Sequence, residues 1–199
     1  MKQYNAIDLF CGAGGLSYGF ESAGFNILLG VDSDQKALEV FEKNHKGSKS
    51  MCGDITKISY CNMKELIGEQ KIDIIIGGPP CQGMSLSGPR KFNDPRNELY
   101  LSYIRLVGEI KPRAFVIENV PGLVSLFKGQ IKDSIIEKFT AMGYSVKYQI
   151  LCAADYGVPQ NRKRVIFVGT RENVEFQYPE KNSTRITCEM ALSDLPPLV

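Results

Sequence analysis

One thiol has an unusual position in this sequence. Cys81 follows two consecutive prolines, just after the apolar run 72–76. The prolines fix the backbone on the amino-terminal side of the cysteine. A structural cysteine is usually a small buried hydrophobic residue, but this one lies where a parallel sheet normally binds its ligands. Taken alone, this position leaves a nucleophile and a structural cysteine equally open.

A glycine-rich turn and two acidic residues indicate a nucleoside site near this thiol. The turn 11–15 follows a predicted strand, but Ser17 occupies the third glycine position of a dinucleotide fingerprint. Asp32 ends the second predicted strand, where a carboxylate can accept hydrogen bonds from a ribose diol. Asp54 follows the third and could accept from an adenine amine. Each acid alone is more often a helix cap or a turn residue. Together they favour a nucleoside without an essential pyrophosphate, and S-adenosylmethionine is the obvious candidate.

Short apolar runs alternate with helical patterns, which predicts an α/β fold with a mostly parallel sheet and helices on both faces. The expected strands are 6–10, 25–31, a short one before Gly53, 72–76, 114–117, and a final pair at 146–151 and 165–168. The expected helices are 16–23, one capped by Asp34, 98–110 and 131–142. The long segment 78–96 is rich in Gly, Pro and Ser, and we predict that it is a mobile active-site lid rather than a passive linker.

Composition is that of an ordinary soluble chain. It has 199 residues, of which 43% are hydrophobic and 23% charged, values typical of a globular protein with one domain. No apolar run approaches the roughly 20 residues of a membrane span. The amino terminus lacks a signal-peptide pattern, so we expect a cytoplasmic protein without a membrane partner. The net charge of +2 neither reveals nor excludes a nucleic-acid partner.

Cysteine and histidine usage narrows the chemistry. The six cysteines form no CxxC pair, which argues against a zinc site and against a disulfide framework. The only histidine, His45, is interpreted as a solvated residue at a helix end. Ser-His-Asp and Cys-His catalysis are therefore not expected.

Four motifs, in this order, resemble the DNA (cytosine-5) methyltransferase family. They are Asp8-Leu9-Phe10 with the glycine turn, Gly78-Pro79-Pro80-Cys81-Gln82, Glu118-Asn119-Val120, and Gln160-Asn161-Arg162-Lys163-Arg164-Val165. The resemblance covers about residues 5–170. Single tripeptides are weak signals, but four in the right order on the expected elements are specific. The resemblance implies the amino-terminal, catalytic portion of such an enzyme, with a Rossmann-like S-adenosylmethionine-dependent methyltransferase fold.

The resemblance also implies a covalent mechanism on cytosine. Carbon 5 of the base is too electron-poor to attack a methyl sulfonium, and a thiolate that adds to carbon 6 makes it nucleophilic. The family assigns this thiolate to Cys81 and a protonated carboxyl near N3 to Glu118. Arg164 would hold the base carbonyl with support from Arg162, although the two arginines taken alone are better explained as an exposed basic edge. The base must leave the duplex stack to be reached.

Family motifs also assign binding residues. For the cofactor, Phe10 would lie against adenine, Asp32 on the ribose and Asp54 on the adenine amine. The remaining cofactor residues implied are Gly12, Ala13, Gly14, Gly15, Ser33, Ile55, Pro80 and Leu99. Ser33 replaces an aromatic residue often found there, so one stacking face for adenine is expected to be missing. DNA contacts are expected from Gln82, Ser85, Ser87, Arg90, Lys91 and Arg96.

We predict a catalytic domain over residues 1–170 and, over 171–199, a connection toward a target-recognition region that the sequence lacks. The chain is interpreted as a fragment or as one subunit of a split enzyme, inactive alone. The expected partners are double-stranded DNA, a second chain with the recognition region and a cognate restriction endonuclease. Two alternatives stay open: a cofactor-binding subunit that acts only with a partner chain, and a methyltransferase of transfer RNA.

Overall fold

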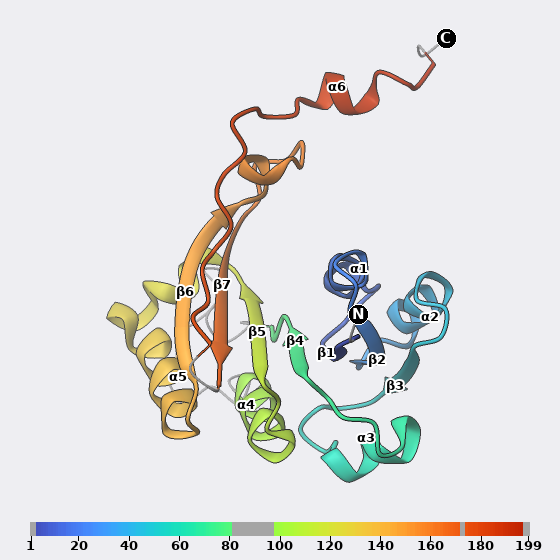
Figure 1. Cartoon of the computed structure of the whole chain (residues 1–199), viewed down its shortest axis with the longest axis vertical. Coiled ribbons are helices and arrows are strands. Elements are labelled where there is room, and N and C mark those ends of the chain that lie inside the picture. Colours follow the sequence, from blue (N-terminus) through green and yellow to red (C-terminus); the bar gives the residue numbers. More distant parts are fainter. Residues whose placement is uncertain (1–2, 81–97, 172–173, 197–199) are drawn as a thin grey trace.

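A mixed seven-stranded sheet organises the computed structural model, which describes residues 3–80, 98–171 and 174–196. The strand order is β3-β2-β1-β4-β5-β7-β6 (Figure 1). The first five strands along the chain pair in parallel: β1 (Asn5–Leu9), β2 (Asn26–Asp32), β3 (Lys49–Cys52), β4 (Ile74–Gly77) and β5 (Ala114–Asn119). The other two pair antiparallel at one edge: β6 (Ser145–Cys152) and β7 (Lys163–Thr170). The predicted mostly parallel sheet is therefore confirmed.

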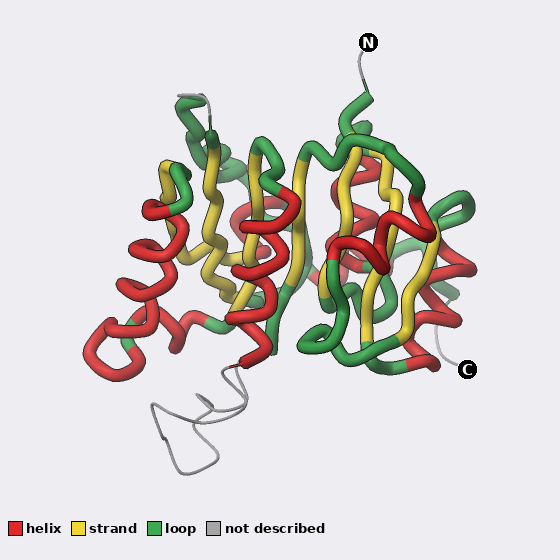
Figure 2. Tube along the Cα trace, turned by 90° about the horizontal axis from the view of Figure 1, so that it is seen from below, coloured by secondary structure: helices red, strands yellow, loops and turns green. Residues whose placement is uncertain are grey.

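Helices cover both faces of this sheet, as the sequence predicts (Figure 2). One face carries α1 (Gly15–Ser22) and α2 (Gln35–Asn44), and the other carries α3 (Tyr60–Ile67), α4 (Glu98–Ile110) and α5 (Gln130–Ala141). Alternation along β1 divides the core, because Ala6 packs with the first pair of helices while Ile7 and Leu9 pack with the second group. No helix in the described parts is long and apolar enough to cross a membrane.

Local signals explain two of the helices. Asp34 caps α2, since its Oδ1 accepts hydrogen bonds from the backbone N–H groups of Lys36 and Ala37. Helix α3 was missed in the sequence, although a capping box joins Ser59 and Asn62 at its start. It buries only Met63 and Ile67, too few apolar positions for a clear helical period.

The chain returns along the sheet after β7. Lys147 of β6 donates to the Phe176 carbonyl at 2.8 Å, and the Tyr178 hydroxyl donates to the Ile166 carbonyl at 2.7 Å. The chain then passes the short turn η5 (Ala153–Tyr156) and reaches helix α6 (Cys188–Leu192), which the sequence did not predict (Figure 1). Three short 3-10 turns complete the described elements: η3 (Pro121–Val124), η4 (Leu126–Gly129) and η5.

Asp155 holds the segment that follows β7, here called the tail (174–196), against the rest of the fold. Its carboxylate pairs with Lys181 at 2.9 Å and with Arg185 at 2.7 Å, and its side chain is only 11% exposed. Lys181 and Arg185 donate hydrogen bonds to the carboxylate and so lower its pKa from the ordinary value. This contribution to stability is present at neutral pH and is lost as acid titrates the carboxylate at a pH below its ordinary range.

We expect Asp155→Asn to loosen the tail without unfolding the sheet. Trypsin cleaves after lysine and arginine, so its cuts after Lys181 and Arg185 should become several-fold faster, because cleavage follows local opening. Limited proteolysis followed by mass spectrometry measures both cuts. Glu180→Gln removes a neighbouring exposed carboxylate and should leave the rates unchanged. Equal rates in the wild type and Asp155→Asn would refute a fastening role.

Candidate active site

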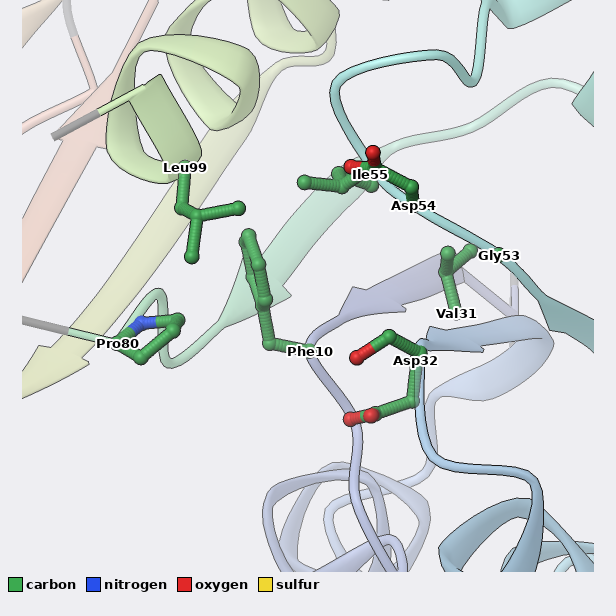
Figure 3. A pocket seen from close by; sticks show the side chains of 9 residues that line it. Phe10, Val31, Asp32, Gly53, Asp54, Ile55, Pro80 and Leu99 are labelled. Atoms are coloured by element: carbon green, nitrogen blue, oxygen red, sulfur yellow. The ribbon is translucent and has the colours of Figure 1, made fainter. Parts of the chain in front are cut away.

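A cavity of about 250 Å³ opens where β1, β2, β3 and β4 end (Figure 3). Parallel strands place their carboxyl ends at one edge of a sheet, and ligands commonly bind there. The residues that line the cavity are Phe10, Val31, Asp32, Ser33, Gly53, Asp54, Ile55, Pro80 and Leu99. All were predicted as cofactor residues except Val31 and Gly53. Each of these two immediately precedes a predicted residue, Asp32 or Asp54, which is the only signal the sequence offered for them.

Phe10 places an aromatic ring within this cavity. It follows β1 directly and has φ +66°, a left-handed conformation that is costly for a bulky residue. Figure 3 shows its ring between Pro80 and Leu99 on one side and Asp32 and Asp54 on the other. The strained turn thus directs a flat apolar surface toward the two carboxylates.

Asp32 joins the end of β2 to the glycine turn. Its Oδ2 accepts from the Gly12 N–H at 2.8 Å, and its Oδ1 accepts from the Asp34 N–H at 3.0 Å. Each carboxylate oxygen can accept more than one hydrogen bond. The carboxylate is therefore held rigidly and still has capacity for a ligand hydroxyl.

Asp54 is prepared as a charged acceptor at the cavity wall. Its Oδ1 accepts from the backbone N–H and the hydroxyl of Thr56 at 3.0 and 2.8 Å. These hydrogen bonds from Thr56, with a smaller contribution from Lys57, lower the pKa of Asp54 below its ordinary value. Asp54 consequently stays ionised at neutral pH.

The glycine turn itself does not line the cavity. Gly12, Ala13, Gly14 and Gly15, all predicted as cofactor residues, contribute no described lining atom, and the turn reaches the cavity through Asp32. Gly12 has φ +53° and Gly14 has φ +91°, conformations that suit glycine. The turn leads directly into α1.

Ser17 explains the missing third glycine of this turn. Its hydroxyl donates to Asp8 Oδ2 at 2.7 Å, and both residues are buried. Burial raises the pKa of Asp8 from its ordinary value of 3.8 to about 7, although this hydrogen bond acts in the opposite direction. Burial, with Asp8 nearby, also raises the pKa of the Cys11 thiol, so Cys11 lacks the thiolate character of a nucleophile.

A carboxyl–arginine cluster lies beyond β4, at the same end of the sheet. Glu118 Oε1 is 2.7 Å from Arg164 Nε and 3.6 Å from Arg162 Nη2. Glu118 comes from the end of β5, which extends past the predicted boundary at Ile117. Arg164 lies at the start of β7, and Arg162 immediately precedes that strand. Because these strands are antiparallel neighbours, the end of one meets the start of the other. The two arginines therefore contact Glu118 and do not form a separate basic edge.

The turn 78–80 separates this cluster from the cavity. Asn119 donates to the Pro79 carbonyl at 2.8 Å, and a Cβ added to Gly78 would lie 3.3 Å from Glu118 Oε2. Pro80 lines the cavity on the other side. One short turn thus touches both parts of the site.

The predicted nucleophile and lid lie outside the described residues. These are Cys81, Gln82, Ser85, Ser87, Arg90, Lys91 and Arg96. The structure describes the turn that immediately precedes Cys81 in the chain.

The prediction that His45 is solvated is wrong. It does end a helix, as the C-cap of α2, but it is only 1% exposed. Its ring nitrogens face Glu21 and the Gly14 carbonyl. Both partners are distant in sequence, so local polarity could not reveal its burial.

Comparison with known proteins agrees with this arrangement. The sequence model of the family C-5 cytosine-specific DNA methylase matches residues 4–196. The chain is 41% identical over 181 residues to the type II methyltransferase M1.HphI of Haemophilus parahaemolyticus, covering 89% of this chain and 49% of that protein. It is 43% identical over 195 residues to M.XorII of Xanthomonas oryzae, covering 96% and 46%.

A solved structure has the same fold over nearly the whole chain. It is described as a DNA modification methyltransferase encoded within a prophage of E. coli, with a TM-score of 0.86 and 32% identity, covering 99% of this chain and 56% of that one. The chain thus spans about half the length of each of these three proteins. From the family match and these identities, the chain belongs to the C-5 cytosine-specific DNA methylase family.

Proposed function

We propose that this chain carries the cofactor site and the reacting groups of a DNA cytosine-5 methyltransferase. In this proposal a methyl group passes from S-adenosylmethionine to carbon 5 of a cytosine flipped out of the duplex. The supporting observation is the juxtaposition of the cavity and the Glu118–arginine cluster on the two sides of the turn that leads to Cys81. Membership of the family supports the same reaction.

The described lining suits S-adenosylmethionine better than a phosphorylated nucleotide. It offers the ring of Phe10 and two carboxylates, Asp32 and Asp54, while none of the described lining residues is basic. Carboxylates repel phosphate but accept hydrogen bonds from a ribose and an amine, and they tolerate a cationic ligand. When bound, the cofactor supplies an electrophilic methyl group on a sulfonium sulfur.

The chain's own groups would then carry the covalent steps. The Cys81 thiolate forms a bond to carbon 6 of the base, which makes carbon 5 nucleophilic. Carbon 5 would then take the methyl group that the cofactor supplies, with S-adenosylhomocysteine as the leaving group. Loss of the carbon-5 proton to a solvent base, return of the N3 proton to Glu118 and cleavage of the carbon 6–sulfur bond would restore the aromatic ring, the acid and the thiolate.

The two carboxyl oxygens of Glu118 have different surroundings, so that one can contact the arginines while the other acts on the base. Among the described residues, Oε1 takes both arginine contacts, while Oε2 lies on the side of Gly78. We infer that Oε2 faces N3 of the flipped cytosine and supplies a proton as negative charge develops there. Arg164 would hold the base carbonyl while it keeps Glu118 in place, and Arg162 would support both.

The remaining assignments follow from this reaction. Residues 1–170 would form the catalytic domain, and 171–199 the connection to a target-recognition region. Double-stranded DNA would be the substrate, with contacts from the lid residues named above, and the cytoplasm would be the site of action. A second chain and a cognate restriction endonuclease are further partners within this proposal.

One second candidate has an observation in its favour. The chain spans about half the length of these relatives, so it could bind the cofactor and depend on further polypeptide for DNA. Under this reading the fold and cavity are complete, but the chain alone forms no bond to cytosine.

DNA that contains 5-fluorocytosine distinguishes the two. Fluorine blocks the final elimination, so a working Cys81 remains bonded to the base and migrates with the DNA on a denaturing gel. We expect the chain to bind S-adenosylmethionine and to form this adduct, in low yield without further polypeptide, and we expect Cys81→Ala to abolish the adduct. Cofactor binding without any adduct would favour the second candidate. If the chain neither binds S-adenosylmethionine nor forms the adduct, the proposed function is overturned.

A further inference from the structure

The only histidine of the chain lies behind the glycine turn, outside the residues assigned a chemical role. His45 is 1% exposed, and its ring packs against Phe41 with 4.5 Å between the ring centres. A polar ring is costly to bury unless its nitrogens find partners. The burial of His45 must therefore be explained by the partners of its two ring nitrogens.

Both ring nitrogens of His45 face oxygen acceptors. Nδ1 is 2.7 Å from Glu21 Oε2 of α1, and Nε2 is 3.1 Å from the carbonyl oxygen of Gly14. The two oxygens belong to different parts of the chain, since Glu21 lies in α1 and Gly14 in the glycine turn. The ring of His45 therefore links the glycine turn to α1.

His45 and Asp32 hold the glycine turn at two different residues. Asp32 accepts from the Gly12 N–H at 2.8 Å, while His45 meets the Gly14 carbonyl, which also accepts from the Tyr18 N–H at 2.8 Å. The fit at Gly14 is close, because an added Cβ would lie 2.0 Å from His45 Nε2. The turn is thus fixed between a carboxylate of the cavity and a buried histidine.

We propose that His45 is a positioning residue of the cofactor site, which acts through the glycine turn. Its ring ties Gly14 to Glu21 and sets the position of Gly12, on which the orientation of the Asp32 carboxylate depends. The inference rests on the proposed function for the identity of the ligand, S-adenosylmethionine. The tie between His45 and Gly14 is a property of the folded chain and can be measured without a ligand.

Three variants separate positioning from simple core packing. His45→Phe keeps a ring against Phe41 but removes both ring nitrogens, and we expect it to weaken S-adenosylmethionine binding about tenfold, the effect of one charge-assisted hydrogen bond. His45→Gln keeps a polar group that can donate and should recover part of this loss. Leu38→Ala is the control, because Leu38 is as buried as His45 and lies in α2, the helix that His45 caps. It should lower the melting temperature while the dissociation constant, measured by calorimetry well below melting, stays unchanged.

Amide hydrogen exchange followed by nuclear magnetic resonance tests the tie directly. We expect faster exchange of the Gly14 and Tyr18 amides in His45→Phe than in Leu38→Ala. Equal exchange in the two variants would overturn the inference. Equal cofactor affinity of the wild type and His45→Phe would also overturn it. If the wild type binds no cofactor, the proposed function fails and amide exchange alone decides the role of His45.

Discussion

Replacing Glu118 by glutamine is expected to lower the rate of methyl transfer by about 10²–10⁴-fold, the range typical of a general acid or base. Glutamine keeps the shape and can still accept from Arg164, but it has no proton to give to N3. Single-turnover methylation of DNA measures this rate. Cofactor affinity should be unchanged, because Glu118 does not line the cavity.

A matched control exists elsewhere in the chain. Glu109 also pairs with an arginine, Arg105, at 2.7 Å, and its side chain is 36% exposed, close to the 28% of Glu118. Glu109→Gln therefore removes a comparable ion pair outside the site and should leave the rate unchanged. If both variants were equally active, the assignment of Glu118 to the reaction would be wrong.

The pH dependence of stability is expected to change when Asp8 is replaced by asparagine. Burial raises the pKa of Asp8 to about 7 from an ordinary value of 3.8, so between these values the folded state holds a proton that the unfolded state lacks. The contribution of Asp8 to stability is therefore greatest below about pH 4, falls as the pH rises, and is constant above about pH 7. Asparagine is neutral at every pH. The free energy of unfolding of Asp8→Asn, relative to that of the wild type, should therefore rise by up to about 4 kcal/mol between pH 4 and pH 7.

Urea unfolding at a series of pH values tests this difference. Other carboxylates titrate in the same range, but they do so in both proteins and cancel in the comparison. Asp133→Asn, at an exposed position of α5, is the control and should show no such trend. If the difference in the free energy of unfolding between Asp8→Asn and the wild type stays constant from pH 4 to pH 8, a buried, proton-binding Asp8 is contradicted.

Much of the cavity could be predicted because its residues follow strands. Parallel strands end at one edge of a sheet, so Asp32 and Asp54 converge although they are far apart in sequence, whereas Pro80 was assigned to the cavity from the resemblance to a family. The carboxyl–arginine cluster is different. Periodicity predicts β7 but not its antiparallel position beside β5, so only the resemblance to a family brought Glu118 and Arg164 together.

The residues that the sequence misjudged depend on distant neighbours. His45 lies in a polar stretch, and its burial follows from Glu21 and Gly14, which are brought to it by the packing of α1 beside α2. Ser17 counted only as a missing glycine, because its partner Asp8 belongs to the preceding strand. Such contacts follow from tertiary packing, which local propensity does not encode.

The turn 78–80 divides the active-site edge into two compartments that are built from different strands. Phe10, Asp32 and Asp54 belong to the β1–β3 side, while Glu118 and Arg164 belong to β5 and β7. Sites without shared partners usually contribute additively to stability and binding. Under the proposed function, residues on the β1–β3 side that do not touch this turn are therefore the places where the site can be reshaped for bulkier methyl donors, by evolution or by design, without altering Glu118 and Arg164.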